Sequence, residues 1–140
     1  MSLTRRNALA LGSAAIAVTL VPLRAFAASE KSMEAIKAFA GEAAVTEGSF
    51  DLTTPEIAEN GNTVPVSFSA PGAKRVMLLA DGNPSPGVAS FEFGALSDSS
   101  GSTRIRLAGT QNVIAVAEMA DGSIVQVAKA VKVTIGGCGG

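Results

Sequence analysis

Histidine, tryptophan and tyrosine are absent from the 140 residues of the sequence, and cysteine occurs only once. Without histidine, the chain lacks the side chain that most often serves as a general base near neutral pH and as a metal ligand. The single cysteine has no histidine to activate it, and the carboxylates are scattered without a convincing pair for acid–base chemistry. The sequence therefore predicts a non-catalytic protein with neither an intrinsic cofactor nor a metal site.

Basic residues are also scarce once the N-terminal segment is set aside. Residues 1–27 hold three of the 11 basic residues and none of the 12 acidic ones, so residues 28–140 carry 8 basic against 12 acidic residues, a net charge of −4. A mildly acidic chain argues against nucleic acid or an anionic membrane as a partner. We expect neither.

The first 27 residues have the pattern of an export signal. Arg5 and Arg6 precede an apolar run over residues 8–23, and residues 25–27 form an Ala-Phe-Ala cleavage triplet. The run is too short and too rich in Gly and Ala for a spanning helix, which needs about 20 predominantly apolar residues. Paired arginines indicate twin-arginine export, but Ala8 stands where a bulky residue is usual, which leaves ordinary secretory export open. Both routes predict a periplasmic protein that begins at Ala28.

Residues 28–135 are expected to form one domain, since about 110 residues suffice to close a single core. Met33, Ile36 and Phe39 at helical spacing predict a short amphipathic helix over residues 29–41, whose apolar stripe packs on the core rather than serving as a docking face. Beyond it, short apolar or alternating runs predict strands over residues 49–53, 64–70, 75–80, 89–93, 103–107, 112–119 and 123–135.

The last two of these runs are separated by Asp121-Gly122, which is a strong hairpin signal. The expected fold class is therefore all-β. We predict an immunoglobulin-like antiparallel β-sandwich of about seven strands, with a short N-terminal helix and a flexible C-terminal arm. The similarity is architectural, because the cysteine pair and the buried tryptophan of antibody domains are missing.

One segment has the spacing of a calcium-binding loop. Asp81, Asn83, Ser85 and Glu92 match positions 1, 3, 5 and 12 of the template. Position 6, however, is Pro86 where the loop needs glycine, and strands rather than helices are expected on both sides. We therefore interpret the segment as a proline-rich surface turn, which could also belong to a partner interface.

The chain ends in Gly136-Gly137-Cys138-Gly139-Gly140, and this pentapeptide is its most informative feature. The glycines leave the thiol without neighbouring side chains to shield it and let the segment change shape at little steric cost. An unpaired cysteine in an oxidising compartment indicates an intermolecular disulfide or a reactive thiol. Residues 136–140 are therefore predicted to form a swinging arm on which Cys138 carries a covalently attached substrate.

The arm can extend well beyond the last predicted strand. At ~3.3–3.6 Å per extended residue, Gly136 to Cys138 place the sulfur roughly 10 Å beyond that strand. A free thiol of pKa about 8.5 is only a few per cent thiolate near pH 7. Activation must therefore come from the active site of a partner that the narrow arm enters.

Five internal segments, together with the terminal pentapeptide, allow a comparison with known families. They are VTEG (45–48), IAENGNTVP (57–65), NPSP (83–86), STRIRLA (102–108) and VAEMADG (116–122). With the terminal motif intact, the chain from residue 28 onward resembles the SoxY family, the sulfur-carrier subunits of the periplasmic Sox thiosulfate-oxidation system.

The resemblance implies a mechanism and a set of partners. A haem-containing enzyme would join thiosulfate oxidatively to Cys138 as a cysteine S-thiosulfonate, a metal-dependent hydrolase would release sulfate, and a sulfur dehydrogenase would oxidise the remaining sulfane sulfur. Family members form a heterodimer with SoxZ, which lacks a signal of its own, so export of a folded complex would explain the twin-arginine route. The lone thiol also predicts a disulfide-linked homodimer under oxidising conditions.

Two other classes of function remain as alternatives. Gly139-Gly140 is also the ending of cytosolic sulfur carriers that use a C-terminal thiocarboxylate, but those are ubiquitin-like and are not exported. The other alternative is a periplasmic β-sandwich that binds or scaffolds partners and whose tail is incidental. Substitution of Cys138 distinguishes these classes from a thiol carrier, because neither alternative depends on the sulfur.

Overall fold

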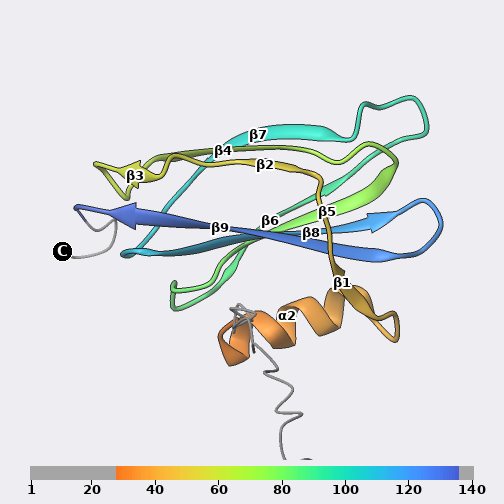
Figure 1. Ribbon diagram of the computed structural model, residues 1–140, viewed down its shortest axis with the longest axis horizontal. Coiled ribbons are helices and arrows are strands. Elements are labelled where there is room, and N and C mark those ends of the chain that lie inside the picture. Colours follow the sequence, from red (N-terminus) through yellow and green to blue (C-terminus); the bar gives the residue numbers. More distant parts are fainter. Residues whose placement is uncertain (1–27, 136–140) are drawn as a thin grey trace, which may run out of the picture.

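The structure, a computed structural model, describes residues 28–135, in which nine strands form two facing sheets with one helix outside them (Figure 1). The elements are α2 (Glu30–Ala40), β1 (Val45–Glu47), β2 (Asp51–Thr53), β3 (Ile57–Ala58), β4 (Val64–Ser69), β5 (Ala73–Ala80), β6 (Gly87–Glu92), β7 (Ser100–Ile105), β8 (Gln111–Met119) and β9 (Ile124–Val133). This part of the chain holds no helix long and apolar enough to cross a membrane.

The larger sheet has the strand order β1-β9-β8-β5-β6, with β3 added at the far end of β9. Antiparallel pairing joins β8 to β9, β5 to β8 and β5 to β6. In contrast, β1 and β3 run parallel to β9, at residues 124–126 and 132–133 respectively. The last strand of the chain therefore has neighbours on both sides near its two ends.

The smaller sheet, β2-β4-β7, lies across one face of the larger one (Figure 1). Its central strand contains Pro65, which lacks an amide hydrogen for a sheet ladder. β2 pairs only with residues 67–69 of β4, so at Pro65 the strand has a partner in β7 alone. A proline is tolerated here because β4 is locally an edge strand.

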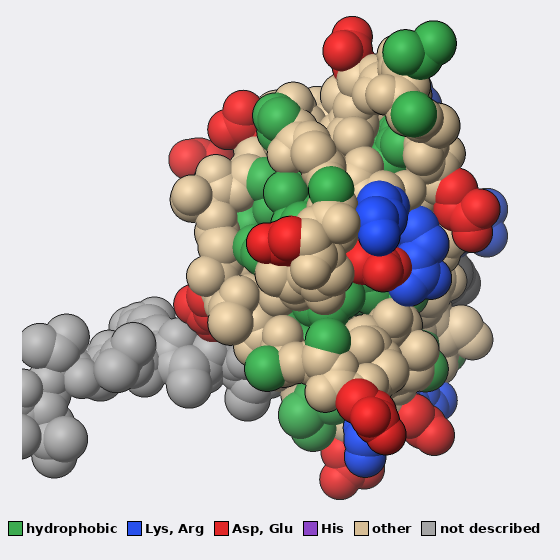
Figure 2. Space-filling view, turned by 90° about the vertical axis from the view of Figure 1, so that its right-hand side faces the viewer, with side chains coloured by type: hydrophobic (Ala, Val, Ile, Leu, Met, Phe, Trp, Pro, Cys, Tyr) green, Lys and Arg blue, Asp and Glu red, His purple; other side chains and the backbone are tan. Residues whose placement is uncertain are grey.

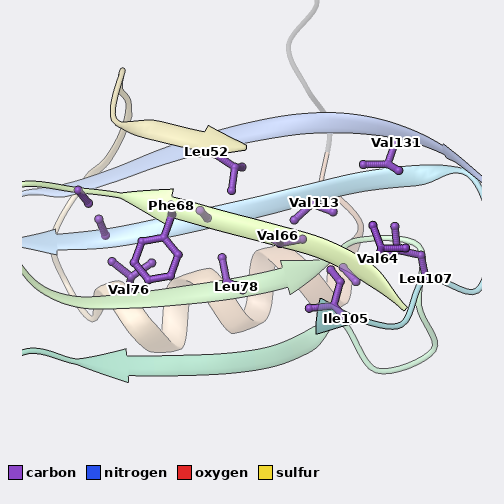
Figure 3. Packing of buried hydrophobic residues seen from close by; sticks show 14 of the residues in the cluster. Leu52, Val64, Val66, Phe68, Val76, Leu78, Ile105, Leu107, Val113 and Val131 are labelled. Atoms are coloured by element: carbon purple, nitrogen blue, oxygen red, sulfur yellow. The ribbon is translucent and has the colours of Figure 1, made fainter. Parts of the chain in front are cut away.

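The main core fills the space between the two sheets. Figure 3 shows Val64, Val66 and Phe68 of β4 directed toward the side chains of β5, β8 and β9. The ring of Phe68 makes edge-to-face contacts with Phe91 and Phe93, at centroid distances of 5.1 and 6.1 Å. Aromatic pairs of this geometry contribute stability beyond simple burial.

A second, smaller core lies between the helix and the opposite face of the larger sheet. Ile36 of α2 packs with Leu79, Ile114, Val116 and Ile124. Both faces of β5 and β8 are thus covered, which explains why these strands have nearly continuous apolar sequences rather than alternating ones.

Local sequence sets the limits of helix α2. The Ser29 hydroxyl accepts a hydrogen bond from the Ser32 amide, as an N-cap does. At the other end Gly41 adopts a φ of 63°, and its amide donates to the Lys37 carbonyl at 2.9 Å. Glycine reaches this left-handed region without steric cost, so the helix stops there.

The fold prediction is confirmed in class, and its helix and hairpin are present. β8 and β9 form the predicted antiparallel pair, with Gly122 at a φ of 86° in the turn. The expected first strand, over residues 49–53, is present in part as β2, whereas β1 and β3, which flank it in the sequence and pair in parallel with β9, were not predicted. Strands of two or three residues are too short to show a period in the sequence.

Candidate functional site

The predicted site residues, Cys138 with Gly136, Gly137, Gly139 and Gly140, lie outside the described residues, as does the predicted signal segment 1–27. The structure does describe the chain up to Ile135, from which those five residues continue. The candidate site is therefore the arm base, which we define as residues 132–135, the last two residues of β9 and the two that follow it, together with the segments that hold them.

On one side, the arm base is bonded to the segment around β3. The Lys132 amide donates to the Glu56 carbonyl at 2.9 Å, and the Thr134 amide donates to the Ala58 carbonyl at 3.1 Å. The carbonyl of Ile135 in turn accepts from the amide of the buried Gly61 at 2.8 Å. Backbone bonds thus follow the chain to the last described residue.

On the other side, a side chain continues the sheet ladder. The Val133 amide donates to the Thr110 hydroxyl at 3.0 Å, one residue before β8 begins. Gly61 links the two sides, since its carbonyl accepts from the Leu107 amide at 2.7 Å. The arm base is therefore fixed from both sides.

Two loops beside the arm base are joined by a polar network. The Asn83 side-chain amide donates to the Arg106 carbonyl at 2.7 Å, and its oxygen accepts from the Ala108 amide at 2.9 Å. Gln111, which is only 8% exposed, donates to Asn83 and accepts from the Gly82 amide at 2.8 Å. These bonds satisfy polar groups that are partly removed from water and hold this end of the sandwich in one shape.

Asp81, at the start of the same loop, is bonded to the beginning of helix α2. Its carboxylate accepts from the Ser29 amide at 2.7 Å. Partial burial raises the pKa of Asp81, but hydrogen bonds from the Ser32 hydroxyl and from the Ser29 amide outweigh it, so the pKa of this carboxyl lies below the ordinary value of 3.8. The carboxylate acts as a structural acceptor.

The four residues that match the calcium template do not gather around a common point. Asp81 is bonded to the helix start and Asn83 to the loop at residues 106–108, whereas Glu92 lies at the far end of β6. Across residues 28–135, no three Cys, His or carboxylate side chains form a group that could hold a metal ion. The segment is a surface turn, as predicted from the sequence.

Two large apolar side chains are exposed at the arm base. Ile57 of β3, which is in register with Lys132, is 57% exposed, and Ile135 is 65% exposed. The loop between β6 and β7 carries Leu96, fully exposed, at the opposite end of the sandwich. Figure 2 views that opposite end, where hydrophobic side chains are interspersed with charged groups of both signs.

A groove of about 320 Å³ lies between helix α2 and the start of β1. Its lining includes Met33, Ile36, Ala40 and Val45, and among the described residues Lys37 is its one charged side chain. Met33 is 51% exposed, so the apolar stripe of the helix is only partly used in packing. The described residues of the lining offer no pair of groups for acid–base chemistry.

Most of the chain matches a known protein family. The model of the family described as "Sulfur oxidation protein SoxY" matches residues 36–138, the cysteine of the terminal motif included. The chain belongs to the SoxY family. This confirms the resemblance found in the sequence. No protein with curated function matches significantly.

Solved structures agree with membership of the SoxY family. The sulfur carrier protein SoxY from Chlorobium limicola f. thiosulfatophilum is similar at 36% identity, with a TM-score of 0.67, over 75% of this chain and 97% of that one. A superoxide reductase (neelaredoxin) from Ignicoccus hospitalis has a TM-score of 0.54 over 62% of this chain and 81% of its own. At 14% identity, it shares the fold alone.

The residues that fix the arm base in this SoxY-family chain were not predicted from the sequence. No local sequence signal indicates that Thr110, Gly61 or the two-residue strand β3 holds the arm base. The Asn60-Gly61 pair indicates only a turn. Thr110 stands just before β8, and its hydroxyl continues the hydrogen bonding between β8 and β9. That role becomes visible only when the pairing register of the two strands is known. The terminal motif itself was found because its composition departs so strongly from the rest of the chain.

Proposed function

We propose that this chain is a covalent carrier of sulfur intermediates in thiosulfate oxidation, held on the thiol of Cys138. One observation carries the proposal: in a SoxY-family chain, the sole cysteine stands five residues after the end of β9, at Val133, where the chain is hydrogen-bonded on both sides. The similar SoxY from Chlorobium is itself described as a sulfur carrier protein. The chain would hold substrate without transforming it.

The chemistry begins with the loading of Cys138. Its thiolate and the outer sulfur of thiosulfate form a disulfide-type bond, and the two electrons removed pass to the haem-containing enzyme, which leaves a cysteine S-thiosulfonate. Water then attacks the terminal sulfonate in a metal-dependent hydrolase, so sulfate leaves and the sulfane sulfur stays on Cys138. A sulfur dehydrogenase would remove six electrons from that sulfur while three water molecules supply its oxygens, which gives a cysteine S-sulfonate. A second hydrolysis would then release this group as sulfate and restore the thiol.

The folded domain contributes position to these steps. Because Ile135 is fixed by Gly61 and Val133 by Thr110, the arm starts from a defined point on a rigid end of the sandwich. Glycines at residues 136–140 let the arm enter a narrow channel. Each partner then supplies the base, metal or redox group that the carrier lacks.

The proposal also covers the cellular location of the protein and its assembly with a partner subunit. We infer a periplasmic protein exported as a heterodimer with SoxZ, because paired arginines in residues 1–27 fit export of a folded complex. The single cysteine also favours a disulfide-linked homodimer when reductant is absent. Intact mass under reducing and non-reducing conditions measures that dimer directly.

Replacement of Cys138 by serine tests the carrier role. In a reconstituted Sox system, Cys138→Ser should abolish thiosulfate-dependent sulfate formation, since an alcohol cannot form the S–S bond. The wild-type protein should show C-terminal adducts by intact mass that reductant removes, and the variant should show none. Unimpaired sulfate formation by Cys138→Ser would contradict the proposal and favour the thiocarboxylate or scaffold alternatives.

A further inference from the structure

We propose that Ile57 and Ile135 form a docking contact for the enzymes that act on Cys138, and that the contacting part of each enzyme is an apolar rim around the mouth of its active-site channel. The inference rests on the proposed carrier function. It adds the surface by which the carrier is recognised.

The length of the arm requires such a contact. Cys138 is the third residue after Ile135, so its sulfur extends only roughly 10 Å from the folded domain. The hydrogen bonds from Gly61 to Ile135 and from Thr134 to Ala58 hold the two residues after β9 in place, so the domain cannot release more chain without breaking them. An enzyme whose reacting centre is recessed by a similar depth must therefore bring its channel mouth onto the arm base.

The exposure of the two isoleucines indicates the chemistry of that mouth. Both side chains are more than half exposed, and Ile57 pairs in register with Lys132, only three residues before Ile135. Single exposed apolar residues are common on protein surfaces. Here, however, Ile57 lies in the strand beside the arm base and Ile135 is the last described residue before the arm, so burial under an apolar rim at the arm base would remove both from water.

Charge does not offer an equally good contact at this place. Glu56 and Glu59 lie close to Lys132, and all three are exposed. Lys132 offsets one of the two carboxylates, and the interaction of the remaining exposed charge with a partner is largely screened beyond a Debye length of about 8 Å in physiological salt. Recognition at the arm base should therefore depend weakly on ionic strength, as expected for apolar burial.

The test uses the full-length exported protein, together with any subunit that co-purifies with it, in two separate assays. One measures oxidative loading of Cys138 with thiosulfate, and the other measures release of sulfate from the loaded carrier. The test variant is a double substitution, Ile57→Thr together with Ile135→Thr. It keeps β-branched side chains at both positions but shortens their apolar part. Leu96→Thr is the matched control at the opposite end of the sandwich.

We expect the double variant to raise the KM for the carrier roughly tenfold in both assays, with kcat unchanged, because apolar burial at the channel mouth is lost. Leu96→Thr should leave both constants unchanged. Alkylation of Cys138 by iodoacetamide and the melting temperature should match the wild-type protein, which shows that the arm and the fold are intact.

An unchanged KM in the double variant, with Cys138→Ser inactive, would overturn the docking contact and leave the carrier function standing. Altered self-association or altered binding of the co-purifying subunit, with unchanged KM, would assign the two isoleucines to a different occupant and also overturn it. Activity of Cys138→Ser would remove the carrier function and this inference together.

Discussion

At the scale of single residues, the carboxylate of Asp81 is a long-range constraint near the arm-bearing end. It fastens the loop after β5 to the first turn of helix α2 through the Ser29 amide. A second link between the helix and this turn comes from the Lys31 ammonium, which donates to the Pro84 carbonyl at 2.9 Å. The same carboxylate was a candidate calcium ligand in the sequence, so its role is decided by a neighbour 52 positions away in the chain.

Replacement of Asp81 by asparagine should lower the free energy of unfolding at neutral pH by about 1 kcal/mol or less, since the group is largely solvated. The pKa of Asp81 is lowered in the folded protein, so its stabilising effect is complete above the ordinary value of 3.8 and is lost as the pH falls through the folded pKa. The difference between wild type and Asp81→Asn should therefore shrink below about pH 4.

Denaturant unfolding from about pH 7 to about pH 3 measures this difference. Asp51→Asn, an exposed aspartate on β2, is the control for a general loss of negative charge. A stability gap for Asp81→Asn that stays constant or grows toward acid pH would contradict the assigned role.

At the scale of elements, β4 and β7 are held at close range by a glycine. A methyl group added to Gly101 of β7 would approach the ring of Phe68 at 2.8 Å. Phe68 is 4% exposed and is packed against Phe91, so its ring has little room to retreat. We expect Gly101→Ala to destabilise the fold by about 1–3 kcal/mol through overpacking.

The matched control is Gly94→Ala, because a methyl group there meets no atom within 4 Å. This substitution should be neutral or slightly stabilising, since alanine restricts the unfolded chain. Urea unfolding of the two variants compares them directly. Equal stability would show that the ring of Phe68 moves aside without cost.

How far elements could be predicted from sequence depended on where their partners lie. The apolar runs of β5 and β8 and the Asp121-Gly122 hairpin are local signals, and the structure confirms them. By contrast, β1 and β3 form strands only through parallel backbone pairing with the edge of β9, which lies 75–79 positions later in the chain. The motif at residues 136–140 was visible in composition, whereas the bonds that fix its base depend on the same distant pairing.

At the scale of the whole molecule, the arm and the domain should be separable. Among the described residues, the buried members of both cores all lie within residues 36–131, before the arm begins. Truncation after Ile135 should therefore leave the melting temperature unchanged while it abolishes thiosulfate-dependent sulfate formation. Calorimetry and the reconstituted assay test the two halves of this prediction.

A core substitution serves as the positive control for the truncation experiment. Leu78→Ala removes a fully buried side chain and should cost about 2–5 kcal/mol, which shows that calorimetry responds to true loss of packing. A melting temperature that falls on truncation would mean that the terminal residues contribute to the fold, contrary to the separation proposed for carrier and arm.

The position of β9 inside the larger sheet has a mechanical consequence. Under the proposed carrier function, an enzyme that dissociates while it still binds the group on Cys138 would pull on the chain along the axis of this strand. Hydrogen bonds to β8, β1 and β3 cross that axis roughly at right angles, so the load falls on many of them together, in shear. Under repeated pulling by successive partners, β9 would therefore resist unfolding. A terminal strand at the open edge of a sheet would instead lose its hydrogen bonds one at a time.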